Sequence, residues 1–162
     1  MNNDITPERL KKLAEAKVCR KCGEEKLITK FNKNKKHPDG RQYECKECAQ
    51  EINLRWKRSP RGVAKTIYSS QKQLSKLRAH NTPKYTFKEF ENWLLNHSKF
   101  NLMYRTWQES DYRRSLKPSV DRIDIMRGYS LDNIQLVTWS KNHNNYIIDV
   151  LLGREKIGRA HV

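Results

Sequence analysis

Four cysteines in this 162-residue chain have a spacing that suits metal chemistry. Cys19 and Cys22 form one C-x-x-C pair, and Cys45 and Cys48 form a second. Each pair can present two thiolates from one tight turn, so that a single ion bridges two turns. The doubled spacing predicts a tetrahedral Zn²⁺ site, which is structural because four thiolates leave no open coordination position. Disulfides would require an oxidising compartment, and free buried cysteines would not explain the doubled spacing.

A second group of polar residues lies in the stretch 118–145, at the ends of the elements expected there. Asp121 and Asn142 offer a carboxylate oxygen and an amide oxygen, which suit Mg²⁺ or Mn²⁺ and leave coordination positions open. Such a cation can bind a scissile phosphate and neutralise the charge that develops during hydrolysis. The residue types therefore allow metal-assisted phosphodiester cleavage. They also allow a simple surface ion pair between Asp121 and Arg122 beside a hairpin.

Arg122 directly follows Asp121 and limits how a proton can be moved. Arginine stays protonated, so Arg122 is suited to clamp a phosphate oxygen or to stabilise the leaving group, and not to act as a base. Water on the metal, or a neighbour such as Asp124 or His143, would then have to accept the proton.

The same stretch resembles the ββα-metal finger of the HNH endonucleases, in the variant common among phage and homing nucleases. The resemblance is carried by D-R-I-D at 121–124, G-Y at 128–129, Asn133 and N-N at 144–145. It implies that Asp121 and one polar helix residue hold a single divalent metal, and that the central asparagine ties the loop together. The family's general base is a histidine directly after the first metal ligand, where this chain has an arginine. The implied site residues are Asp121, Arg122, Asn133, Asn142 and His143, with Asn145 as a further helix candidate for water or phosphate contact.

The charge of the chain indicates a polyanionic partner. Lys and Arg number 34 against 18 Asp and Glu, which gives a formal net charge of +16 and a pI near 9.9. Nucleic acid is the polyanion that such a balance favours, and a membrane surface is a weaker alternative without a basic helix that has a wide apolar face. The expected partner is duplex DNA. The expected contacts are Lys33, Lys35, Lys36, Arg41, Arg58, Arg61, Lys65 and Lys72.

The pattern of breaks and periodic segments predicts an α+β chain with a small zinc ribbon, central basic helices and a C-terminal ββα domain. Short strands are expected at 26–31 and 41–44, and helices at 49–82 with a break at Ser59-Pro60. Thr86 and Glu89 form a capping box. The expected parts are an N-terminal helix or arm at 1–17, the ribbon at 18–50, a basic helical linker at 51–82, the ββα-metal domain at 83–152 and a tail at 153–162.

Three expectations concern the C-terminal half. Alternating apolar residues suggest a short strand after residue 99, followed by a loop to 117. Residues 119–123 and 134–138 read as two strands of the finger. Ser140 is then expected to cap a helix whose apolar side includes Ile147, Ile148 and Leu151.

Three functions from different classes are compatible with these patterns. The first is a metal-dependent DNA endonuclease, in which one metal site cuts one strand and a double-strand cut needs a homodimer or a second binding event. The second is a DNA-binding protein on the same fold that no longer cuts, which Arg122 favours. The third is an RNA-binding or ribosome-associated zinc protein, which the ribbon and the charge allow. The N-terminal residues lack a signal-peptide pattern and no run reaches membrane-spanning length, so the expected location is the cytoplasm, in a bacterial host of a phage.

Overall fold

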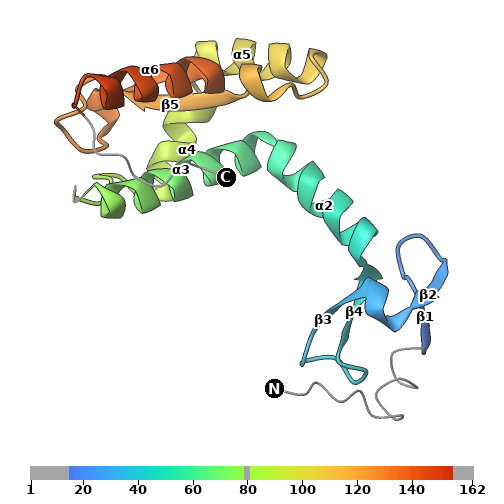
Figure 1. Cartoon of the computed structure of the whole chain (residues 1–162). Helices are drawn as coiled ribbons and strands as arrows, with labels where there is room; N and C mark the ends of the chain where they lie inside the picture. The colour runs from blue at the N-terminus through green and yellow to red at the C-terminus, as the bar shows by residue number, and fades with distance from the viewer. Residues whose placement is uncertain (1–14, 79–80, 155–162) are drawn as a thin grey trace. The chain divides into compact units, whose positions relative to one another are not determined.

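The computed structural model describes residues 15–78 and 81–154 of an α+β chain (Figure 1). Within those ranges it holds five α-helices and three two-stranded hairpins. The chain divides into two compact units, Met1–Trp56 and Lys57–Val162. The helix expected within 1–17 and the tail at 153–162 fall largely outside the described residues, and Ala16–Val18 forms a strand.

The first unit is built from two small antiparallel hairpins around the cysteines. β1 (Ala16–Val18) pairs with β2 (Glu25–Leu27), and β3 (Phe31–Lys33) pairs with β4 (Arg41–Cys45). The strand expected at 26–31 is therefore wrong in detail. A 3₁₀ turn at Ile28–Lys30 divides that segment between the two hairpins and buries the Ile28 side chain.

The core of the first unit is very small and consists largely of cysteine side chains. Cys19, Phe31, Cys45 and Cys48 form its buried cluster. A core of this size contributes little hydrophobic free energy, which is why domains of this class usually need a staple such as a metal ion.

Two consecutive helices follow, separated at Ser59 as the sequence predicts. α2 is Lys46–Arg58 and α3 is Pro60–Leu77. Ser59 is the N-cap of α3, where its hydroxyl accepts a hydrogen bond from the Gly62 N–H at 3.1 Å. Pro60 fits the first helical position because its missing N–H would have had no partner there.

Helix α3 is part of the core of the second unit. Its Val63, Ala64 and Ile67 are buried in one cluster with Phe90 and Leu94 of α4 (Phe87–Leu95). The sequence placed 51–82 in a linker, whereas the structure draws the boundary after Trp56.

The capping box that the sequence predicts at the start of α4 is confirmed. The Thr86 hydroxyl accepts a hydrogen bond from the Glu89 N–H at 3.3 Å, and the Glu89 carboxylate accepts one from the Thr86 N–H at 2.7 Å. These reciprocal bonds satisfy two backbone donors that the first helical turn would otherwise leave open.

The strand suggested after residue 99 is wrong, because Ser98–Glu109 forms helix α5. Phe100, Tyr104 and Trp107 are four and three residues apart, which places them on one side of a helix. Phe100 and Trp107 are buried in the core, whereas Leu102, which made the pattern look alternating, is exposed. Helical spacing therefore explains the burial better than a period of two.

A ββα unit closes the chain. β5 (Pro118–Arg122) pairs with β6 (Ile134–Thr138) in antiparallel register, with Asp121 opposite Gln135, and α6 (Trp139–Leu151) follows directly. The strands lie within one residue of the expected segments.

The predicted cap and apolar side of the last helix are wrong. Thr138 caps α6, and Ser140 lies inside the first turn, where its hydroxyl donates to the Ser115 carbonyl at 2.9 Å. Ile147, Ile148 and Leu151 are exposed. The opposite face of α6, which carries Asn142 and Asn145, is the one that meets β5.

Candidate functional site: a four-cysteine centre and a ββα cleft

The four cysteine sulfurs converge on one point in the first unit. All four Sγ atoms lie within 4.8 Å of one another. In a tetrahedral site with Zn–S bonds of about 2.3 Å, neighbouring sulfurs are roughly 3.8 Å apart, so the cluster has the dimensions that a zinc ion requires. Among the described residues this is the one group of three or more Cys, His, Asp or Glu side chains placed to hold a metal. The cluster is consistent with a structural Zn²⁺ in a site like that of a zinc ribbon.

Backbone hydrogen bonds and burial make the four thiols chemically unequal. The Cys45 N–H donates to Cys19 Sγ at 3.3 Å. Bonds of this kind from the backbone of Cys22 and Cys45 lower the pKa of Cys19 to about 6. Burial and contacts with the other thiols raise the pKa of Cys48 to about 12. Without metal, a proton therefore remains on Cys48 at neutral pH, and a bound cation must displace it.

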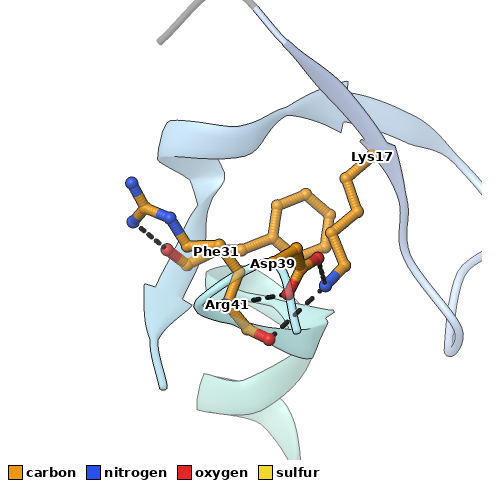
Figure 2. A network of polar contacts seen from close by, with 4 residues as sticks. All are labelled: Lys17, Phe31, Asp39 and Arg41. Carbon is orange, nitrogen blue, oxygen red and sulfur yellow. Dashed lines mark hydrogen bonds and ion pairs between the residues drawn. The ribbon is translucent and has the colours of Figure 1, made fainter. Parts of the chain in front are cut away.

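One basic residue that the sequence assigned to DNA contact, Arg41, is engaged inside the ribbon (Figure 2). Its guanidinium donates to the Phe31 carbonyl at 3.1 Å, and its backbone N–H donates to the Asp39 carboxylate at 3.0 Å. Lys17 bonds to the same carboxylate and to the Arg41 carbonyl. The network closes the β3–β4 turn. The other three cations expected to contact DNA from the ribbon, Lys33, Lys35 and Lys36, are exposed.

In the second unit, Asp121 and the helix residue Asn145 meet across the ββα unit. Asn145 Nδ2 donates to Asp121 Oδ2 at 2.8 Å, and the Arg122 N–H donates to Asp121 Oδ1 at 2.9 Å. Asn142, the expected metal ligand, lies one turn earlier on the same helix face. Its amide donates to the Val120 carbonyl at 3.1 Å and to the Ser119 hydroxyl at 2.8 Å. The sequence named Asn145 as a helix candidate without giving it this partner.

Asn133 holds the loop between the two strands. Its side chain accepts a hydrogen bond from the Asp124 N–H at 2.9 Å and donates to the carbonyls of Asp124 and Gly128, both at 3.0 Å. The side chain is fully buried, with 1% of its surface exposed. Because it satisfies three backbone groups at once, it fixes the path of the loop that carries Asp124.

Arg122 is buried as well, with 5% of its surface exposed. Its guanidinium donates to the Ile125 carbonyl at 2.6 Å and lies 5.6 Å from the centre of the Tyr129 ring. Burial lowers its pKa, with Arg78 nearby acting in the same direction. Arg122 is therefore buried and bonded to the backbone of the loop.

An open cleft of about 440 Å³ joins these elements. Its acidic members are Asp121, Asp124 and Asp149, and its amides are Asn145 and Gln135. The residues that line it are Asp121, Arg122, Ile123, Asp124, Ile125, Gln135, Asn145, Ile148, Asp149 and Arg154.

The cleft includes one residue that the sequence analysis did not name and leaves out one that it did. Asp149 was not singled out by the sequence, although its spacing of four residues from Asn145 places both on one helix face. His143, which was singled out, is exposed and stacks on the Trp139 ring at 4.8 Å. It does not line the cleft.

The basic residues expected to contact DNA from the second unit differ in how they are held. Arg61 forms an ion pair with Glu91 at 3.2 Å. Lys65 and Lys72 are exposed and lie over the rings of Phe87 and Tyr68. Arg58 lies 4.0 Å from the centre of the Tyr112 ring.

No helix in the described part of the chain has the length and apolar character needed to cross a membrane. Comparison of the chain with protein-family models, with curated proteins and with solved structures found no match.

Proposed function

We propose that the chain is a metal-dependent endonuclease of the HNH type, which hydrolyses or nicks phosphodiester bonds in duplex DNA. The observation that carries the proposal is the pairing of Asp121 with Asn145 in an open cleft of a ββα unit. The net charge of +16 supports a polyanionic substrate. The zinc ribbon would stabilise the first unit without taking part in the chemistry.

The cleft residues fit a hard divalent cation such as Mg²⁺ or Mn²⁺. Asp121 and Asn145 line the cleft and offer the carboxylate and amide oxygens that such ions accept, and few protein ligands are needed because these ions retain waters. Asn142, the ligand expected from the sequence, lies one turn earlier on α6 and does not line the cleft. When bound there, the cation would neutralise charge that develops on the phosphate.

The chain's own residues would hold the loop and move the proton. Asn133 and Arg122 fix the loop through their bonds to its backbone groups. Arg122 cannot accept a proton at the position where the family has a histidine. The carboxylates of Asp124 and Asp149 line the cleft and can do so, which makes them better candidates for the base than His143.

A DNA-binding protein on the same fold that does not cut is the second candidate. The burial of Arg122 and its bond to the Ile125 carbonyl favour it, because they give this position a structural task in place of a catalytic one. For this candidate, the affinity for DNA should not depend on Mg²⁺ and should not change when the Asp121 carboxylate is removed.

The test is a supercoiled-plasmid assay with Mg²⁺ or Mn²⁺ present or omitted. The endonuclease should nick the plasmid only with the metal, and Asp121→Ala should reduce the rate at least about a hundredfold, a loss typical of removing transition-state charge stabilisation. Asp132→Asn is the matched control, since Asp132 is an exposed carboxylate of the same loop that pairs with Arg127 at 2.5 Å. If the protein binds the plasmid and shifts it in a gel but does not nick it in either metal, the result would favour the DNA-binding protein.

A further inference from the structure

A half-buried lysine with cationic neighbours stands at the start of β5. The Lys117 N–H donates to the Arg114 carbonyl at 3.2 Å, and the Lys117 carbonyl accepts from the Trp139 N–H at 2.8 Å, so its backbone is held on both sides. Burial lowers the pKa of its ammonium group, and the charges of Lys57 and Arg114 lower it further. The chain therefore gathers three like charges at a place where solvent screens them incompletely.

Arg114, and Arg58 which follows Lys57 in the chain, are each held by an aromatic ring. The Arg114 guanidinium lies 4.2 Å from the centre of the Trp139 ring, and the Arg58 guanidinium lies 4.0 Å from that of Tyr112. A guanidinium that stacks on a ring keeps its N–H edge available for a planar or tetrahedral oxyanion. Both arginines are thus placed before any ligand arrives.

The backbone that carries the Tyr112 ring, on which Arg58 stacks, is strained. Asp111 and Tyr112 have positive φ values of 52° and 59°, a conformation that residues other than glycine adopt rarely. The Tyr112 ring meets the Trp107 ring edge-on at 4.9 Å. Strain of this kind persists only where the surroundings enforce it, and it is common at binding sites.

These cations have no acidic partners in the chain as far as it is described. Lys57, Arg58, Arg114 and Lys117 form no ion pair within residues 15–78 and 81–154, whereas Lys26 and Arg61 do. Glu109 and Asp111, which precede Arg114 in the chain, are exposed and form an ion pair with none of the four. The positive end of the α6 dipole adds to the same field, because α6 begins at Trp139.

We propose that Lys57, Arg58, Arg114 and Lys117, here called the Lys117 surface, bind the phosphate backbone of duplex DNA. The choice of duplex DNA rests on the proposed function. Lys117 and Asp121 are four positions apart in extended chain, which is about 13 Å, or roughly four base-pair steps measured along the axis of the duplex. One DNA strand can therefore contact the Lys117 surface while it passes the cleft.

The test measures binding of a fluorescent DNA duplex by anisotropy, without divalent metal, over a range of salt concentrations. Arg114→Gln/Lys117→Gln should lower the slope of log affinity against log salt by about 1.8, because each lost phosphate contact removes about 0.9, and should weaken binding at least about fivefold at physiological salt. Lys84→Gln/Lys88→Gln removes the same charge from two exposed lysines and should stay within about twofold of wild type. Arg114→Lys/Lys117→Arg keeps both charges and should retain the slope.

Equal binding by Arg114→Gln/Lys117→Gln and by its control would overturn the proposal, as would a wild-type chain that binds no duplex DNA. Preference for an RNA duplex, with the same loss in the double variant, would overturn the choice of DNA. Circular dichroism identifies a misfolded variant, and the single substitution Arg114→Gln at an exposed position, which should lower the slope by about 0.9, then decides. Because metal is absent, a chain that never cuts DNA can still confirm the Lys117 surface, so failure of the endonuclease proposal is distinguishable.

Discussion

The two units place their polar groups by different physical means. In the ribbon, each C-x-x-C pair fixes two thiols through local chain geometry, and the four sulfurs lie within 4.8 Å of one another. In the ββα unit, Asp121 and Asn145 come from a strand and a helix 24 residues apart in sequence, and they meet only because the core packs correctly. In the first unit, the fold therefore depends on the four-cysteine site. In the second unit, the cleft depends on the fold.

The largest expected effect comes from removing a thiol of the four-cysteine cluster. Cys45→Ser should abolish the folded first unit, because structural zinc contributes about 10–16 kcal/mol in comparable small domains and Phe31 is the one large side chain in the buried cluster around the thiols. The second unit, with its own core, should keep its amide chemical shifts. Two-dimensional NMR and zinc analysis would report both units in one sample.

The matched control is Ser110→Ala in the second unit, which removes a hydroxyl without touching the ribbon. A first unit that keeps dispersed amide signals without zinc would contradict the contrast, since it would mean that this unit folds without the metal.

The pH dependence of zinc binding tests the state of the thiols in the four-cysteine site. The pKa of Cys48 is about 12, so the free chain carries a proton there that zinc displaces at neutral pH. Zinc affinity should therefore rise about tenfold per pH unit for each proton displaced, and fall more steeply below about pH 6, where Cys19 also becomes protonated. Calorimetry in buffers of different ionisation enthalpy counts the released protons, and an affinity independent of pH would contradict this expectation.

In the second unit, the largest expected effect comes from Asn133. Asn133→Ala leaves the Asp124 N–H and two loop carbonyls without their partner, which should cost about 2–4 kcal/mol of unfolding free energy in this unit alone. Asn144→Ala, an exposed position on α6, should be nearly neutral. Denaturant unfolding followed by the second unit's tryptophans measures both, and equal stabilities would show that the loop is held by other contacts.

The smallest expected effect is that of a helix cap. Thr86→Ala removes the hydroxyl that accepts from the Glu89 N–H, while the bond from the Thr86 backbone N–H to the Glu89 carboxylate can remain. The change should cost about 1 kcal/mol, because the α4 core contacts also remain. Thr86→Ser is the control, since it keeps the hydroxyl. Thermal unfolding resolves the difference, and a loss as large as that of Asn133→Ala would mean that α4 depends on its cap more than on packing.

Local rules account for most of what the sequence predicted correctly. The cysteine cluster, the break at Ser59-Pro60, the Thr86 box and the strands at 118–122 and 134–138 each depend on neighbouring residues. The errors occurred where tertiary packing decides. The helix α5 was mistaken for a strand because the exposed Leu102 imitated alternation.

The same distinction holds within the candidate site. Asp121 follows from its motif, but the partnership with Asn145 and the place of Asp149 in the cleft depend on how α6 is rotated against β5. The apolar residues of α6 suggested the opposite rotation, and no local signal corrects it. Likewise, nothing in the order of residues brings Lys57 close to Lys117, because these residues become neighbours only when the second unit folds.

The position of Trp139 gives the second unit an optical signal. Its indole contacts both the Arg114 guanidinium and the His143 ring, at 4.2 and 4.8 Å. Emission from this side chain should therefore change when an oxyanion binds the guanidinium stacked on it, and the difference between wild type and Trp139→Phe isolates that signal from the other tryptophans. An unlabelled chain can thus report in real time, by stopped-flow fluorescence, how quickly a ligand arrives and departs.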